Sequence, residues 1–233
     1  MKILHLYYDL MNLYGDYANI SALSRILEKN GLQHTVHRLS ITDEIDFNEY
    51  DFVYIGSGSE ENEKIVLTHL ARYKENLKDY IESEKLLLMT GNAFEMLGSS
   101  IKSFLGDFEG LGLFDFSVIE QDKTRTTADA VFSFEKGLQT LVGFVNKCST
   151  TEGISTPLFS VEMGLGNAEN DNVEGLAYKN LFGTHLTGPI LVKNPEFLGY
   201  IASLLAGKAL KTDAFTYEKK AYDITLKKLR ERK

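Results

Sequence analysis

The first hundred residues predict an α/β fold with a mostly parallel central sheet and helices on both of its faces. Short apolar runs alternate in this half with longer segments of helical periodicity, in the order β-α-β-β-α-β-α. A chain of 233 residues, 43% of them hydrophobic, can bury one sizeable core. These observations favour a single large α/β domain.

The helices of this half are predicted from caps and apolar spacing. Asp16 or Asn19 can cap the first helix, which is expected to end at Gly31. Apolar residues spaced by four and three from Val66 to Tyr80 predict the second helix. Four apolar, β-prone runs predict the strands, at residues 3–7, 34–39, 51–55 and 86–89.

The second half is more irregular. Loops are expected at residues 110–114 and 162–172, which are rich in glycine or polar residues. Asn194, as a cap, and Pro195, in the first turn, predict a helix that Gly207 closes. Strands are expected at residues 116–119, 130–134 and 141–145.

The chain is expected to end in a charged helical tail. Residues 1–207 are expected to form the domain, and residues 208–233 a tail that belongs to it. Basic residues are frequent in the last fifteen positions, from Lys219 to Lys233. Two interpretations remain open, a solvated helix face or a segment that docks a partner.

Charge and composition exclude several function classes. The net charge of −8 argues against nucleic-acid binding, because nucleic-acid binders usually carry a basic face. No apolar run approaches the ~20 residues that span a bilayer, and the N-terminus lacks the pattern of a signal peptide. The single cysteine, Cys148, excludes an intrachain disulfide framework. A cytoplasmic protein is expected.

Residues 84–98, EKLLLMTGNAFEMLG, organise the rest of the chain. A buried strand runs there directly into a tight turn and a short helix, which is the layout of a nucleophile elbow. Gly91 stands at the tip of this elbow, where the attacking side chain of an enzyme would stand. The elbow is therefore either an ordinary turn or an active site without its nucleophile.

The loop GSGSEEN follows the third predicted strand. Its backbone amides can converge on an anion or an oxyanion, or it can be an ordinary turn between a strand and a helix. The lysine and hydroxyl residue that end a P-loop are absent, and the Gly-x-Gly-x-x-Gly pattern is not met. No nucleotide or other cofactor is expected.

The histidines and the cysteine do not predict a metal site. Among the five histidines only His34 and His37 are close in sequence, and three residues apart on a strand they point to opposite faces. Cys148 has no histidine near it in the sequence, which favours an inert thiol over a nucleophile.

Several blocks of the sequence together resemble the class I glutamine amidotransferases of the CobB/CobQ-like (cobyric-acid-synthase-like) branch. They are LYYDLMNLYGDYANI, GSGSEEN, TGNAFEMLG, GLGLFD, GFVNK and EGLAYKNLFGTHLTGPILVKNP, and the similarity runs from residue 3 to about residue 205. Within that branch the chain is most similar to the glutaminase (GatD-like) subunits of lipid II isoglutaminyl synthase. The resemblance implies a flavodoxin-like three-layer sandwich.

The resemblance also implies a chemistry. A cysteine at the elbow of such proteins attacks the side-chain amide of glutamine, a histidine activates that cysteine, and a glycine loop stabilises the oxyanion. The ammonia passes to a Mur-ligase-like (MurT-like) partner, which uses ATP to amidate the glutamate of the lipid II stem peptide. The expected partners are therefore such a subunit and glutamine.

The catalytic residues of the family are replaced in this chain. The family's catalytic cysteine aligns with Gly91 of this chain. The family's histidine, which precedes a glycine-proline pair, aligns with Thr187. The triple glycine of the family's oxyanion loop falls on Gly56, Ser57 and Gly58. Substrate binding is associated with Asn92, with Glu95, where the family usually has glutamine, and with Arg125. No shift of the alignment brings a cysteine to the elbow, because Cys148 is far away in the sequence.

Three hypotheses follow from these substitutions. The first is a glutaminase-deficient homologue that acts as a scaffold, regulator or binding subunit in peptidoglycan synthesis. The second is an active glutaminase subunit that uses unusual residues, such as Thr90 or His185, or residues of a partner. The third is that the vacated pocket binds a small metabolite without turning it over. Neither glycine nor threonine can replace a cysteine–histidine pair near neutral pH, which favours the first.

Overall fold

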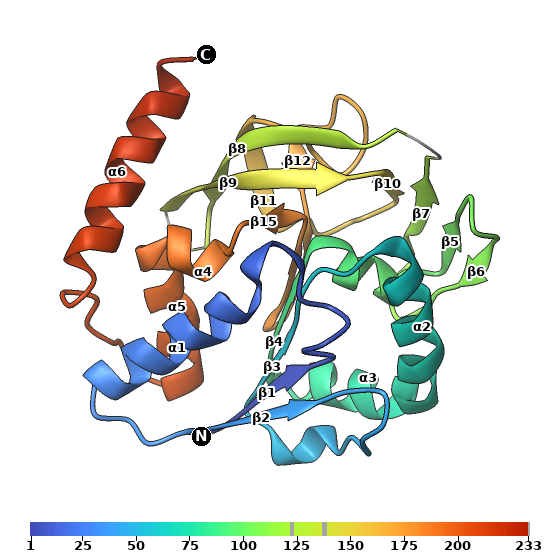
Figure 1. Ribbon diagram of the computed structural model, residues 1–233, viewed down its shortest axis with the longest axis horizontal. Helices are drawn as coiled ribbons and strands as arrows, with labels where there is room; N and C mark the ends of the chain where they lie inside the picture. The colour runs from blue at the N-terminus through green and yellow to red at the C-terminus, as the bar shows by residue number, and fades with distance from the viewer. Residues whose placement is uncertain (122–123, 137–138, 233) are drawn as a thin grey trace.

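The core of the protein is a six-stranded sheet with the strand order β13-β14-β4-β3-β1-β2. The computed structural model describes residues 1–121, 124–136 and 139–232. All neighbouring strands of this sheet pair in parallel except β13 and β14, which confirms the mostly parallel sheet. Figure 1 shows β4, β3, β1 and β2 in this order. Its strands are β1 (Lys2–Leu6), β2 (Thr35–Leu39), β3 (Phe52–Ile55), β4 (Leu86–Thr90), β13 (Leu176–Tyr178) and β14 (Leu181–Thr184).

Helices cover both faces of this sheet. Successive strand residues point to opposite faces, so Leu4 packs with the cluster of α2 and α3, and Ile3 with that of α1 and α5. The predicted three-layer arrangement is therefore confirmed. The helices are α1 (Tyr17–Lys29), α2 (Glu60–Leu70), α3 (Lys74–Glu82) and α5 (Pro195–Ala206).

The predicted helix caps are wrong in their roles. Asp16 precedes α1 but makes no capping hydrogen bond, and Asn12 Oδ1 instead accepts the amide of Tyr17 at 2.8 Å. The side chain of Asn194 likewise leaves α5 uncapped and exchanges two hydrogen bonds with the backbone of Val142. Both side chains have buried partners elsewhere, which sequence spacing does not reveal.

The helix predicted from Val66 to Tyr80 is two helices. A 3₁₀ turn, η3 (Ala71–Tyr73), separates α2 from α3. The apolar spacing of four and three continues through the turn, because both helices bury their apolar residues in the same cluster. Periodicity alone therefore missed the break.

Two smaller sheets hold most of the second half. Their strand orders are β10-β7-β5-β6 and β12-β11-β8-β9-β15, and Figure 1 shows the second of them above the central sheet. The strands predicted at residues 116–119, 130–134 and 141–145 are present as β7, β8 and β9, and β11 takes the first two residues of the loop expected at 162–172. The strands are β5 (Ser100–Lys102), β6 (Phe108–Glu109), β7 (Ser117–Glu120), β8 (Thr126–Phe134), β9 (Gln139–Lys147), β10 (Ser149–Glu152), β11 (Phe159–Met163), β12 (Val173–Glu174) and β15 (Leu186–Thr187).

The charged tail contains the helix α6 (Thr216–Arg230), which packs against β8 and β9. Leu229 is buried against Val131 and Val142, and the hydroxyl of Tyr222 donates to the carbonyl of Thr140 at 2.6 Å. Its basic residues are mostly exposed, and Lys233 lies outside the described residues. Neither α6 nor any other helix of the described residues combines the length and the apolar character needed to cross a membrane.

Candidate functional site

The strand, turn and helix predicted for residues 84–98 are present. Strand β4 ends at Thr90, and the 3₁₀ helix η4 (Gly91–Leu97) begins at the next residue. Gly91 has a φ of 65°, in the left-handed region that glycine adopts without steric cost. The backbone therefore turns sharply at the tip of the elbow.

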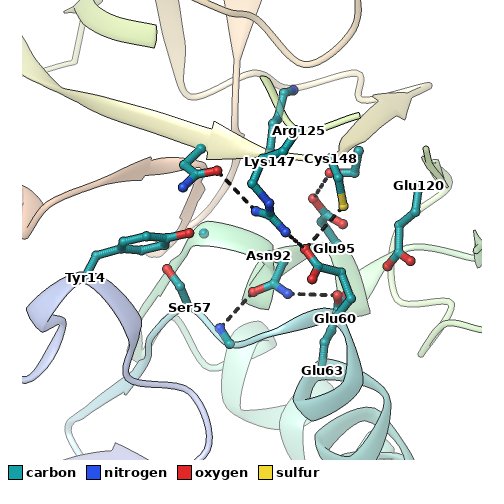
Figure 2. Close-up of a pocket in the computed structure, with 14 residues that line it drawn as sticks. Tyr14, Ser57, Glu60, Glu63, Asn92, Glu95, Glu120, Arg125, Lys147 and Cys148 are labelled. Atoms are coloured by element: carbon teal, nitrogen blue, oxygen red, sulfur yellow. Dashed lines mark hydrogen bonds and ion pairs between the residues drawn. The ribbon is translucent and has the colours of Figure 1, made fainter. Parts of the chain in front are cut away.

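A pocket lies at this tip, and it collects residues from five separate parts of the chain (Figure 2). Of the residues that the sequence singled out for the site, Gly56 and Thr187 lie outside its lining. The others line it, namely Ser57, Gly58, Gly91, Asn92, Glu95 and Arg125.

Ser57 fills the space in front of Gly91. A Cβ atom built on Gly91 would lie 2.0 Å from Ser57 Oγ and 2.5 Å from Ser57 Cβ, much closer than atoms of folded proteins approach. Ser57 is only 2% exposed, and its hydroxyl has no hydrogen-bond partner within the described residues. The chain thus places a serine side chain where a side chain on residue 91 would begin.

The amides of the glycine loop are already engaged by side chains. The amide of Ser57 donates to Asp16 Oδ2 at 2.6 Å, and the amide of Gly58 donates to Asn92 Oδ1 at 3.0 Å. Burial raises the pKa of Asp16 to about 6, and the hydrogen bond from the amide of Ser57 offsets part of that rise. Asp16 therefore fixes the position of the loop through the amide of Ser57.

Thr187 makes its side-chain hydrogen bond away from the elbow, whereas His185 contacts Glu95 of the elbow helix η4. Thr187 Oγ1 donates to the carbonyl of Phe144 at 2.9 Å, within the pairing of β15 with β9. His185 Nε2 lies 2.7 Å from Glu95 Oε1, and its Nδ1 lies 3.1 Å from Glu174 Oε1. Both ring nitrogens of this buried histidine are thereby held by carboxylates.

Buried carboxylates dominate the floor of the pocket. Glu63 Oε2 accepts from Asn92 Nδ2 at 2.9 Å, and Glu95 Oε1 accepts from Ser149 Oγ at 2.5 Å. Glu120 Oε1 lies 2.5 Å from Lys64 Nζ, which also lies 3.8 Å from Glu63 Oε2. Burial raises the pKa of Glu63 well above its usual range, and the neighbouring Glu95 adds to the rise.

Cys148 is close to the elbow in space although it is distant in sequence. It lines the same pocket as Gly91, which its position in the sequence does not reveal. Its Sγ lies 3.2 Å from Glu60 Oε1, and Glu60 also pairs with Arg125. Burial and then the hydrogen bond to Glu60 raise the pKa of the thiol to about 12.

Sequence reasoning missed several residues of this pocket. Glu60 lies in the GSGSEEN block and Glu63 follows that block directly, so both positions carried a usable signal. Lys147 ends the GFVNK block, whereas Glu120 carries no comparable signal, because only the packing of β7 brings it to the pocket. As arranged, the pocket offers many oxygen atoms and no activated nucleophile among the residues described here.

Comparison with protein families supports the resemblance. Residues 2–195 match the family described as the CobB/CobQ-like glutamine amidotransferase domain. The glutamine-hydrolysing lipid II isoglutaminyl synthase subunit GatD of Streptococcus pneumoniae (strain ATCC BAA-255 / R6) is 35% identical over 214 residues, which are 91% of this chain and 81% of that protein. The subunit of the same name from Staphylococcus aureus (strain N315) is 34% identical over 224 residues, or 96% of this chain and 90% of that one.

Solved structures show the same fold. A crystal structure of a glutamine amidotransferase aligns with a TM-score of 0.56 and 13% identity, covering 87% of this chain and 98% of that one. A glutamine amidotransferase from Thermotoga maritima aligns with a TM-score of 0.50 and 12% identity, covering 98% and 89%. At these identities the likeness concerns the fold alone.

Proposed function

The chain belongs to the family of CobB/CobQ-like glutamine amidotransferase domains, and on that premise we propose that it is a GatD homologue without glutaminase activity. In this proposal the protein serves as a scaffold or binding subunit. The observation that carries the proposal is the pairing of Gly91 with Ser57, whose hydroxyl lies 2.0 Å from where a Cβ on residue 91 would lie.

A glutaminase of this kind needs a nucleophile and a base. Gly91 has no side chain, and the hydroxyl of Thr187 is committed to the carbonyl of Phe144. In comparable catalytic triads, removal of the nucleophile lowers kcat by roughly 10⁴ to 10⁶. Loss of both groups leaves no route to a thioester with glutamine at this elbow.

The amides that would stabilise an oxyanion also have hydrogen-bond acceptors already. An oxyanion hole needs amide N–H groups that are free to bind the developing charge. The amides of Ser57 and Gly58 instead donate to Asp16 and Asn92. The amides of the loop are thus satisfied by side chains from other parts of the chain.

Neighbouring residues do not supply a substitute nucleophile in this proposal. With a pKa of about 12, Cys148 carries almost no thiolate near neutral pH, and its sulfur faces the carboxylate of Glu60. Thr90 Oγ1 is buried 2.8 Å from the hydroxyl of Tyr54. His185 is held between two carboxylates, so it is not positioned to activate either group.

The partner in this proposal is a Mur-ligase-like (MurT-like) subunit in the cytoplasm. Both curated relatives are named as subunits of lipid II isoglutaminyl synthase, which suggests that this chain also assembles with a second subunit. A scaffold role requires only that the surface toward that subunit be retained. The vacated pocket then need not turn over glutamine.

The test is ammonia release from glutamine by the purified protein, alone and with a co-expressed Mur-ligase-like subunit. The pneumococcal subunit serves as the positive control. We expect no glutamine-dependent ammonia above the background of the buffer in either case, together with co-purification of the partner. Ammonia release by the chain alone, insensitive to thiol reagents, would refute the proposal, and release only in the complex would favour an active subunit.

A further inference from the structure

The C-terminal helix α6 has an outer face that makes no contact with the rest of the domain. We propose that this face binds the surface of a bilayer that contains anionic phospholipids, so that the protein attaches to the membrane surface without crossing it. Such binding requires only α6 and is independent of any reaction at the elbow.

The charge of the chain is divided unevenly between the domain and its tail. Residues 208–233 contain nine basic and four acidic residues, which gives them a net charge of +5. Because the whole chain carries −8, residues 1–207 carry −13. A basic segment on an otherwise acidic protein is typical of a tail that binds an anionic surface.

One group of basic side chains in the tail holds α6 on the domain. These side chains make ion pairs with acidic residues of other elements. The pairs are Lys219–Glu196 at 2.7 Å, Arg230–Glu162 at 3.1 Å and Arg232–Asp129 at 2.9 Å. Their charges are therefore used within the protein.

A second group of basic side chains is not used in this way. Lys220 and Lys228 are exposed, and neither makes an ion pair with any residue that the structure describes. Lys227 has only a distant pair, 3.9 Å from Glu231 one turn further along the same helix. The ammonium groups of these three lysines are available to a partner.

The available lysines share one side of α6 with two exposed apolar residues. Tyr217 and Ile224 are seven positions apart, and Lys220 and Lys228 follow them by three and four positions, so all four lie on one helical face. Tyr217 is 85% exposed and Ile224 is 48% exposed. The face extends over about 16 Å of helix.

The opposite side of α6 is the one that packs on the domain. It contributes three side chains to a cluster with β8 and β9, namely Tyr222, Leu226 and Leu229. Figure 1 shows α6 along one margin of the molecule, with α4, α5 and β8 on its inner side. The lysines and the two apolar residues therefore point away from the protein.

An anionic bilayer matches both parts of this face. Each lysine close to an anionic leaflet strengthens binding about fivefold. Tyrosine is favoured at the level of the headgroups, and an aliphatic side chain such as Ile224 is buried at the boundary of headgroups and acyl chains. An acidic protein surface would account for the lysines but not for the exposed isoleucine. The acidic domain would repel a nucleic acid.

The test is flotation of the full chain with vesicles of phosphatidylcholine, either pure or with phosphatidylglycerol as about a third of the lipid. We expect the protein to float with the anionic vesicles and to remain in solution with the neutral ones. Raising sodium chloride from about 0.05 M to about 0.5 M should release the protein, because salt screens the attraction.

Two variants and one control assign the binding to this face. Lys220→Gln with Lys228→Gln should weaken vesicle binding roughly 25-fold, about fivefold for each lysine. Lys78→Gln with Lys102→Gln changes the net charge equally at exposed positions of α3 and β5, and should bind like the native protein. Ile224→Ser should weaken vesicle binding roughly fivefold but leave elution from a heparin column unchanged, because heparin offers no apolar layer.

Absence of flotation with anionic vesicles at low salt would overturn the proposal. Equal weakening by the α6 pair of substitutions and by the control pair would also overturn it, because the overall charge would then decide binding. Undiminished vesicle binding by Ile224→Ser would indicate a face for polyanions in general and refute the bilayer as its partner. Salt-sensitive self-association in place of flotation would assign the face to a second copy of the chain, against the proposal.

Discussion

The contact between Ser57 and the bare Cα of Gly91 predicts a strong energetic coupling between the two positions. A Cβ on residue 91 meets Ser57 Oγ at 2.0 Å, and Gly91 has a φ of 65°. The left-handed backbone costs a non-glycine residue about 1–2 kcal/mol, and overpacking adds about 1–3 kcal/mol. Gly91→Ala should therefore destabilise the protein by about 2–5 kcal/mol.

Gly31→Ala is the matched control for the backbone term. Gly31 has a φ of 69°, and a Cβ there meets no atom within 4 Å, so this variant should lose only about 1–2 kcal/mol. Ser57→Gly should rescue about 1–3 kcal/mol of the loss in Gly91→Ala and nothing of the loss in Gly31→Ala. Urea unfolding followed by circular dichroism measures all variants, since the chain has no tryptophan.

If Gly91→Ala is no more destabilising than Gly31→Ala, or if Ser57→Gly gives no rescue, Ser57 does not occupy the place of a side chain on residue 91. The same coupling governs attempts to restore activity. Gly91→Cys with Thr187→His should remain inactive, whereas adding Ser57→Gly should allow measurable ammonia release if the loop can still donate its amides.

Three further predictions follow from the buried groups and the tail. Cys148, with its pKa raised from 9.0 to about 12, should react with a thiol reagent near pH 8 about a thousandfold more slowly in the native protein than in guanidinium chloride, and equal rates would contradict that pKa. Burial raises the pKa of Asp16 from 3.8 to about 6. The contribution of Asp16 to the free energy of unfolding should therefore be fully present below pH 3.8, fall by about 3 kcal/mol between pH 3.8 and about 6, and be absent above that pH. Asp16→Asn, which keeps an acceptor for the loop amide, should flatten this dependence in unfolding titrations. Leu229→Ala should destabilise α6 by about 2 kcal/mol or more, as hydrogen exchange would show, whereas Ile224→Ala, at a position 48% exposed, should change stability by less than about 0.5 kcal/mol.

Local patterns were sufficient for most of the central fold. The apolar strands and amphipathic helices of the first half lie where their periodicity predicted them, apart from the break between α2 and α3, because each buries an apolar face against the sheet. The caps failed for a specific reason. Asp16 and Asn194 have polar side chains suited to capping, but tertiary contacts offered them better-buried partners, namely the amide of Ser57 and the backbone of Val142.

The functional roles of the predicted site residues remain proposals, and the structure shows which other residues surround them. Cys148, predicted to be an inert thiol and far from the elbow in the sequence, lines the pocket at the elbow. Glu120 could not be anticipated, since nothing in its sequence environment relates it to Glu63. Such residues meet only when sheets with separate strand orders pack together.

By itself the sequence determined the fold class and the family, and it predicts Gly91 and Thr187 as the replaced catalytic positions. Those are properties of periodicity and of residue identity, which can be read along the chain. Only the tertiary structure decided that Ser57 lies in the space before Gly91 and that three carboxylates share one small cavity. Steric exclusion and electrostatic coupling act over a few ångströms, so they depend on which distant residues the fold brings into contact.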